Sequence, residues 1–103
     1  MFTLLKNIFG KDSSGIEQAL QQGAIIIDVR TPEEFREGHI EGSKNIPVTE
    51  IKQKLEMIRK WNKPVITVCL SGGRSTVAKS FLTSAGIEAH NGGSWFNLKN
   101  LKS

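Results

Sequence analysis

The feature that most constrains the fold is an apolar run that ends at the only cysteine of the chain, Cys69. Four of the five residues at 64–68 are apolar, which is typical of a strand buried on both faces of a sheet. Gly72 and Gly73 follow, and apolar residues at helical spacing begin after Ser75. The stretch therefore predicts a buried strand, a tight loop and a helix, with the cysteine at the junction.

This junction favours a reactive thiol. The two glycines allow backbone conformations with positive φ, which turn N–H groups into the loop. The start of the following helix carries partial positive charge. We therefore expect the pKa of Cys69 to lie well below the roughly 8.5 of a free cysteine. Ser71 and Ser75 are candidate hydroxyl donors to the sulfur, and Ser75 is equally suited to cap the helix.

Helix and strand patterns alternate along the rest of the chain. Strands are expected at 24–29, 44–48, 65–69 and 87–90, and a turn at 91–93. Helices are expected at 14–23 (capped by Ser14 and Glu17), from Pro32, at 49–61, after the loop (apolar at 77, 78, 81, 82 and 85) and at 94–98. This alternation predicts an α/β fold with a mainly parallel sheet. Because parallel strands end at one rim, Asp28, Arg30 and Cys69 are expected to lie there together.

Length and cysteine content limit the organisation of the protein. The 103 residues are expected to form one domain over 14–103, with residues 1–13 as a lead-in packed on it. A single cysteine excludes an internal disulfide and a cysteine-built zinc site. A lone free thiol favours a reducing compartment, and we expect a cytoplasmic location.

The charge balance is mildly basic, with a formal net charge of +4 and a pI near 9.5. A positive field favours small anions near a site. No run of Lys and Arg with interleaved aromatic residues is present, so nucleic acid is not an expected partner. No apolar run approaches the roughly 20 residues that span a bilayer, so no membrane span is expected.

Four blocks of the sequence resemble, in order, the signatures of a single rhodanese domain, a sulfurtransferase family. The blocks are Asp28-Val29-Arg30 with Glu33-Glu34-Phe35, Gly38-His39-Ile40-Glu41-Gly42-Ser43-Lys44-Asn45-Ile46-Pro47, Cys69-Leu70-Ser71-Gly72-Gly73-Arg74-Ser75, and Gly92-Gly93-Ser94-Trp95. The resemblance implies a rhodanese-like α/β fold, in which a five-stranded, mainly parallel sheet has helices on both faces.

The resemblance also implies ping-pong sulfur transfer through a persulfide on Cys69. A small anionic donor such as thiosulfate would supply the sulfur, and cyanide, a thiol or a sulfur-accepting protein would take it. This chemistry needs no cofactor and no metal. The Arg74 side chain would hold an anionic donor or steady the loop, and so short a chain is expected to have an open, shallow site. The family's anion-binding cradle falls to the backbone amides of Leu70, Ser71, Gly72, Gly73, Arg74 and Ser75.

Three further functions stay open. Protein tyrosine phosphatases resemble this loop but place five residues between cysteine and arginine. Here four residues separate Cys69 from Arg74, a spacing better suited to a persulfide sulfur than to phosphate. The same domain could also be a persulfide relay that docks on protein partners, or a non-catalytic interaction module. The intact cysteine and loop argue against the module.

Several residues have both a functional and a structural interpretation. Asp28 and Arg30 are candidate supporting residues, but a buried strand-end aspartate more often satisfies loop amides, and an arginine pairs with a carboxylate. His39 has no matching ligand set for a metal and is interpreted as structural. Trp95 and Phe96 are interpreted as lid or core rather than as substrate contacts.

Overall fold

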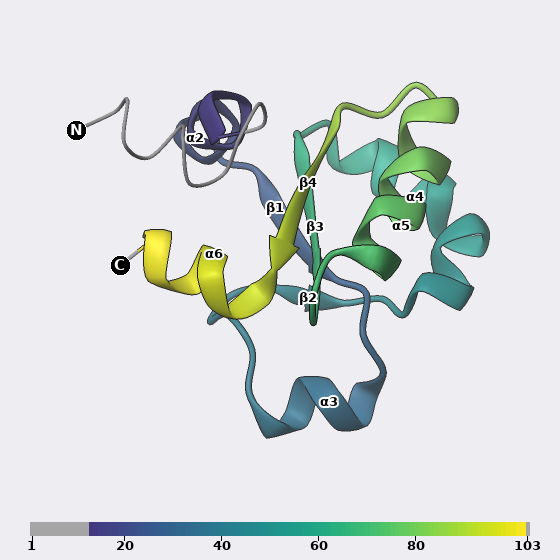
Figure 1. Cartoon of the computed structure of the whole chain (residues 1–103). Helices are drawn as coiled ribbons and strands as arrows, with labels where there is room; N and C mark the ends of the chain where they lie inside the picture. Colours follow the sequence, from purple (N-terminus) through teal and green to yellow (C-terminus); the bar gives the residue numbers. More distant parts are fainter. Residues whose placement is uncertain (1–12, 103) are drawn as a thin grey trace.

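The computed structural model describes residues 13–102, in which helices and strands alternate (Figure 1). In chain order the elements are α2 (Ser13–Gln21), β1 (Ile25–Asp28), α3 (Pro32–Glu37), β2 (Lys44–Asn45), the 3₁₀ helix η2 (Val48–Lys54), α4 (Leu55–Trp61), β3 (Val65–Cys69), α5 (Gly73–Ser84), β4 (Ala89–Ser94) and α6 (Trp95–Lys102). The α/β fold predicted from the sequence is confirmed.

The strands form one parallel sheet in the order β2-β1-β3-β4. Helices α2 and α6 cover one face of the sheet, and η2, α4 and α5 cover the other (Figure 1). Five strands were expected, whereas the described residues contain four. The parallel sheet with helices on both faces is as predicted.

Strand β3 separates the two cores because its side chains alternate between the faces. Val65 and Cys69 face the core under η2, α4 and α5. Ile66 and Val68 face the core under α2 and α6. All five residues of the strand are buried, as expected for a central parallel strand. Cys69 therefore points toward α5, the helix that follows it in the chain.

The end of the sheet differs from the prediction. Residues 91–93 were expected to form a turn, but they continue β4, which pairs with β3 up to Cys69. The register shifts between Thr67 and Val68, opposite Asn91 and Gly93, so Gly92 is the extra residue of a β-bulge. A Cβ atom on Gly92 would lie 2.8 Å from Ile66 Cγ2, so only glycine fits there.

The helix predicted at 49–61 begins as η2 and becomes α-helical only at Leu55. Ile51 and Ile58 are buried, as the apolar spacing predicted. On α5 the predicted apolar stripe is wrong at Val77, which is 46% exposed. The helix instead buries Ser75, Ala78 and Leu82.

Two predictions concern residues outside the described part of the chain. The lead-in at 1–13 precedes it almost entirely, and the Ser14 side chain proposed as a cap is likewise not described. Among the described residues, no helix is both long and apolar enough to cross a membrane.

Candidate active site

The predicted rim forms where β1 and β3 end side by side. Asp28 pairs with Val68 in the parallel ladder, and the Val29 N–H donates to the Val68 carbonyl at 2.9 Å. Helix α3 lies beyond these carboxyl ends of the strands (Figure 1). The structure therefore brings Asp28, Arg30 and the cysteine to one edge of the sheet, as the sequence predicted.

The sulfur of Cys69 lies inside the turn between β3 and α5. The Gly72 N–H donates to Sγ at 3.0 Å, and the Ser75 N–H donates to it at 3.4 Å. The Ser75 hydroxyl lies 3.4 Å from Sγ. Gly72 has a φ of +118°, a conformation that L side chains rarely adopt, so the close turn over the sulfur depends on glycine.

These donors affect the ionisation of the thiol. Burial raises the pKa of Cys69, but hydrogen bonds from the Ser75 hydroxyl and from the N–H groups of Ser75, Gly72 and Ser71 outweigh it and lower the pKa overall. Each of these donors stabilises the negative sulfur more than the neutral thiol. The direction agrees with the sequence prediction.

The exposure of the turn is uneven. Leu70 at its tip is 59% exposed, whereas Cys69 is only 1% exposed. The expectation of an open site therefore holds for the outer surface of the turn but not for the thiol itself. Ser75 is not the helix cap, because Gly72 occupies that position and Ser75 lies buried inside the first turn of α5. Its hydroxyl lies within reach of the sulfur but also donates to the Gly72 carbonyl at 3.0 Å and to Asn91 Oδ1 at 2.7 Å.

Asn91 is a site residue that the sequence analysis missed. Its Oδ1 lies 2.7 Å from the Ser75 hydroxyl and accepts the Gly93 N–H at 2.9 Å. Its Nδ2 donates to Thr76 Oγ1 at 2.8 Å, and the Thr76 hydroxyl donates to the Gly72 carbonyl at 2.7 Å. Asn91 thus braces both Ser75 and Gly72 from the neighbouring strand. In the sequence its only signal is a turn-like Asn-Gly-Gly, which gives no indication of this position.

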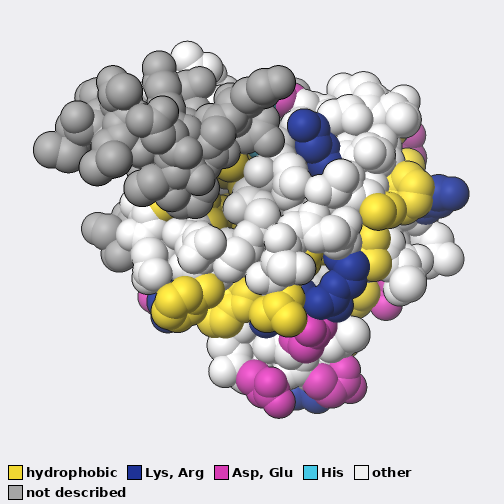
Figure 2. Space-filling view, in the orientation of Figure 1, with side chains coloured by type: hydrophobic (Ala, Val, Ile, Leu, Met, Phe, Trp, Pro, Cys, Tyr) yellow, Lys and Arg dark blue, Asp and Glu magenta, His cyan; other side chains and the backbone are white. Residues whose placement is uncertain are grey.

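Arg74 makes a two-pronged ion pair with Glu34 of α3. Its Nη1 and Nη2 lie 2.8 Å and 3.1 Å from Oε1 and Oε2 of the carboxylate. The side chains are 37% and 31% exposed, so the pair lies at the surface of the site. Figure 2 shows acidic side chains gathered over α3, with basic side chains next to them toward the body of the molecule. The sequence analysis named both residues but did not predict that they pair.

Asp28 and Arg30 form a buried ion pair with each other. Arg30 Nε and Nη2 donate to the two oxygens of Asp28 at 2.8 Å and 2.7 Å, and the Arg30 N–H also donates to Oδ1. Nη2 donates further to the Gly38 carbonyl at 2.7 Å. The side chains are 0% and 4% exposed. This geometry agrees with the structural interpretation, in which the pair fixes the chain after β1.

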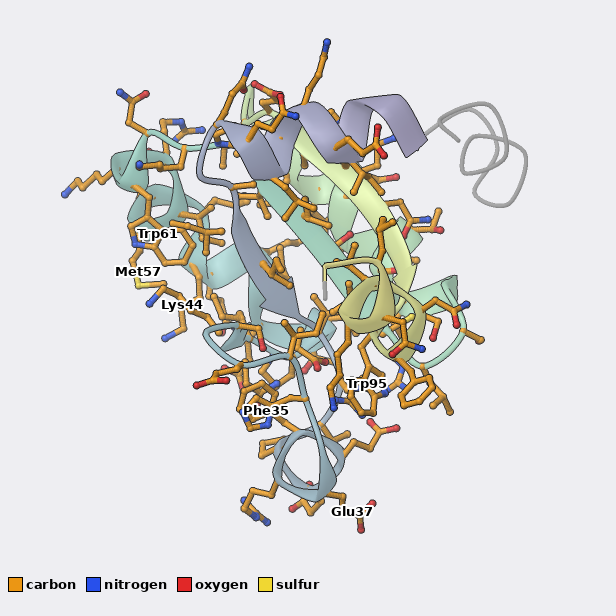
Figure 3. The ribbon with its side chains drawn as sticks, turned by 90° about the vertical axis from the view of Figure 1, so that its left-hand side faces the viewer. Phe35, Glu37, Lys44, Met57, Trp61 and Trp95 are labelled. Atoms are coloured by element: carbon orange, nitrogen blue, oxygen red, sulfur yellow. The ribbon has the colours of Figure 1, made fainter. Side chains whose placement is uncertain are left out.

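Aromatic residues close the rim on either side of this pair. Trp95 lies over the Arg30 guanidinium, with the ring centroid 4.7 Å from Cζ, and packs on the core under α6. His39 stacks on the Phe35 ring at 3.7 Å and donates from Nδ1 to the Phe35 carbonyl. Figure 3 shows Phe35 and Trp95 at the end of the molecule nearest α3. Phe96 is 53% exposed and so is not part of the core, which leaves the lid as its predicted structural role.

Between residues 13 and 102, no three His, Cys, Asp or Glu side chains gather closely enough to hold a metal ion. The site therefore combines the Cys69 thiol, whose pKa is lowered by backbone and hydroxyl donors, with the nearby Arg74 guanidinium. Such a site suits nucleophilic attack by sulfur on an electron-poor atom.

The family profile described as "Rhodanese-like domain" matches residues 14–100. The chain belongs to the rhodanese-like family. Among its relatives, the protein YqhL of Bacillus subtilis is 44% identical over 63 residues, or 61% of this chain and 49% of YqhL. "Thiosulfate sulfurtransferase PspE" of Escherichia coli is 36% identical over 61 residues, or 58% of this chain and 59% of PspE. The rhodanese-like chain thus spans about half to three fifths of these relatives' own length.

A solved structure agrees with this family. The "rhodanese with anions" from E. coli superimposes with a TM-score of 0.65 at 32% identity, over 72% of this chain and 89% of that one. The rhodanese-like fold and the family are therefore established by both sequence and structure. The roles of individual residues have to be argued from the site geometry.

Proposed function

We propose that this rhodanese-like chain is a sulfurtransferase that carries a sulfane sulfur as a persulfide on Cys69. The observation that carries the proposal is the convergence of the Gly72 N–H, the Ser75 N–H and the Ser75 hydroxyl on one buried sulfur. These donors favour the thiolate, which is the nucleophilic form of cysteine. They also suit the negative outer sulfur of a persulfide.

The first half-reaction loads the enzyme. The Cys69 thiolate attacks the outer sulfur of thiosulfate, a new S–S bond forms, and the old S–S bond breaks. Sulfite leaves with the bonding electron pair, so Cys69 becomes a persulfide anion. Arg74 is the candidate group for attracting the anionic donor, since its guanidinium is the charged side chain of the turn. The amides of residues 70–75 are proposed to surround the transferred sulfur.

The second half-reaction unloads the enzyme. An acceptor such as cyanide attacks the outer persulfide sulfur, and the Cys69 thiolate leaves with the electron pair. Thiocyanate is released and the thiolate is restored. No external oxidant or reductant is needed. The sulfurtransferase name of the relative PspE supports thiosulfate as a donor to test first.

A protein thiol is a second candidate acceptor. The exposed Leu70, which directly follows Cys69, is the observation that favours it, because an apolar side chain beside a reactive sulfur can be buried against another protein. Transfer to a protein would use the same loaded Cys69 and would differ only in the second half-reaction.

The proposal is tested by thiocyanate formation from thiosulfate and cyanide. Cys69→Ser is expected to abolish turnover, because serine cannot form the persulfide, while leaving the urea unfolding midpoint close to that of the original chain. Turnover by the folded serine variant would contradict the proposal. Hydrolysis of an aryl phosphate in place of sulfur transfer would favour a phosphatase.

A further inference from the structure

The ion pair between Arg74 and Glu34 engages the only cation in the turn after Cys69. Both terminal nitrogens of the guanidinium face the carboxylate, at 2.8 Å and 3.1 Å. Two parallel N–H···O bonds of this kind are the geometry with which arginine also binds oxyanions. An anion that approached Arg74 would therefore meet a guanidinium that is already paired with the Glu34 carboxylate.

Glu34 is itself held in place by α3. Its Oε1 accepts the Thr31 N–H at 2.9 Å and the Thr31 hydroxyl at 3.1 Å, which forms a capping box with the Glu34 N–H. These contacts fix the carboxylate before any donor arrives. Hydrogen bonds from Arg74 and then from the Thr31 backbone lower the pKa of Glu34 to about 2, so it is ionised near neutral pH.

Several negatively charged groups already act on the Arg74 guanidinium. Glu34 faces it from α3, and the Cys69 thiolate and Asp28 also raise the pKa of Arg74 by charge attraction. The Asp28 charge is matched by Arg30. Repulsion between Glu34 and an arriving anion grows with the charge of that anion. A dianion is therefore affected more than a monoanion.

This inference rests on the proposed function. We propose that Glu34 is a selectivity residue, whose carboxylate competes for Arg74 and so disfavours dianionic sulfur donors relative to monoanionic ones. Thiosulfate is the dianionic donor, and an aryl thiosulfonate is its monoanionic counterpart. In both cases Cys69 attacks the outer sulfur and the S–S bond breaks. Sulfite leaves from thiosulfate and an aryl sulfinate leaves from the thiosulfonate.

The test compares Glu34→Gln with Glu33→Gln. Both substitutions remove one negative charge from α3, but the Glu33 side chain is 74% exposed and pairs with Arg36 at 3.9 Å, whereas Glu34 pairs with Arg74. Persulfide loading of Cys69 is followed by intact-protein mass against the concentration of thiosulfate or of benzenethiosulfonate. In Glu34→Gln the half-saturating concentration of thiosulfate is expected to fall roughly fivefold, a typical upper value for one exposed ion pair. The half-saturating concentration of benzenethiosulfonate should change much less.

In Glu33→Gln the ratio of the two half-saturating concentrations should match that of the original chain. If this ratio changed equally in both variants, the effect would arise from the loss of overall charge, and the proposal would be overturned. Weaker thiosulfate loading in Glu34→Gln would also overturn it, because Glu34 would then position Arg74 rather than compete for it.

A second readout separates this inference from the proposed function. Inorganic sulfate, a dianion that cannot transfer sulfur, is tested for protection of Cys69 against iodoacetamide. Sulfate should protect Glu34→Gln at roughly fivefold lower concentration than the original chain, by the same ion-pair argument. If neither donor loads Cys69, the proposed function fails, yet sulfate protection still decides the role of Glu34. Equal protection by sulfate in the original chain, Glu34→Gln and Glu33→Gln would overturn the role of Glu34 as a selectivity residue.

Discussion

The Cys69 sulfur and the Asn91 amide are linked through a single hydroxyl group, that of Ser75. This hydroxyl lies 3.4 Å from Sγ and 2.7 Å from Asn91 Oδ1. Since it carries one hydrogen, donation to Asn91 or to the Gly72 carbonyl, 3.0 Å away, competes with donation to a thiolate. The Gly93 N–H also donates to Oδ1, which fixes the orientation of the amide. The orientation of the Ser75 hydroxyl beside the Cys69 sulfur thus depends on a side chain from the adjacent strand.

Asn91→Asp is predicted to raise the pKa of Cys69. The new carboxylate would hold the Ser75 hydrogen away from the sulfur and place a negative charge close to it. The charge attraction between Arg74 and the Cys69 thiolate would remain. The measurement is the pH dependence of Cys69 alkylation, whose midpoint should move to higher pH. Asn97→Asp, the same change at an exposed position on α6, is the control, and equal midpoints in the two variants would contradict the link.

The buried ion pair at the end of β1 leads to a prediction about stability. Asp28→Asn would leave the Arg30 guanidinium buried without a countercharge, which typically costs about 3–5 kcal/mol. The free energy of unfolding in urea is expected to fall by that amount. Glu33→Gln, which affects only an exposed pair with Arg36, should leave it nearly unchanged. A small effect of Asp28→Asn would show that Arg30 finds another partner or water.

At the scale of elements, the bulge in β4 determines where the site residues lie. The extra residue, Gly92, lies against Ile66, Val68 and the Thr67 carbonyl, with no room for a Cβ atom. The bulge changes the register of β4 just beyond Asn91, beside α5. Bulges of this kind redirect side chains next to functional sites. The glycine is therefore required by packing rather than by a turn.

Gly92→Ala is predicted to destabilise the protein by about 1–3 kcal/mol, the usual penalty of overpacking. The matched control is Gly73→Ala, at the first residue of α5, where a Cβ atom would meet nothing within 4 Å. That change should be neutral or stabilising by up to about 1 kcal/mol, because alanine restricts the unfolded chain. Thermal or urea unfolding measures both. Equal unfolding free energies for Gly92→Ala and Gly73→Ala would contradict the claim that packing in the bulge requires glycine at position 92.

Local patterns in the sequence predict the elements that carry the site, but not the pairs between them. The run at 64–68, the two glycines and the apolar spacing after Ser75 were enough to place Cys69 between a strand and a helix. Asn91 and Glu34 were not identified as site residues, because their partners are 16 and 40 positions away and meet them only through the order of the strands and the placement of α3. Asn91-Gly92-Gly93 resembles a turn locally, and only pairing with β3 makes it a strand.

On the scale of the whole molecule, the Glu34–Arg74 pair connects α3 to α5 across the end of the sheet. The Glu33–Arg36 pair, by contrast, lies within α3 and connects it to no other element. The ion pair requires an ionised Glu34, and ionisation also strengthens the hydrogen bond that the Glu34 carboxylate accepts from the Thr31 N–H. The attachment of α3 to the body of the protein is thus predicted to depend on pH.

Glu34 is predicted to contribute to stability above pH 4.5 and to lose that contribution as the pH falls toward 2. Hydrogen bonds from Arg74 and Thr31 lower its pKa from 4.5 to about 2 in the folded protein, so between these values the unfolded chain binds the proton first. The difference in unfolding free energy between the original chain and Glu34→Gln should therefore shrink between pH 6 and pH 2.5. The corresponding difference for Glu33→Gln should not change in this way. If the difference in unfolding free energy between the original chain and Glu34→Gln did not change with pH, the lowered pKa of Glu34 would be contradicted.

The most direct test of the central claim is the intact mass of the protein after incubation with thiosulfate, with Cys69→Ser as control. We predict a gain of one sulfur atom in the original chain, its loss on addition of cyanide, and no gain in the serine variant. Absence of the sulfur after treatment with thiosulfate, benzenethiosulfonate and a small-thiol persulfide would contradict the proposal that Cys69 is a persulfide carrier.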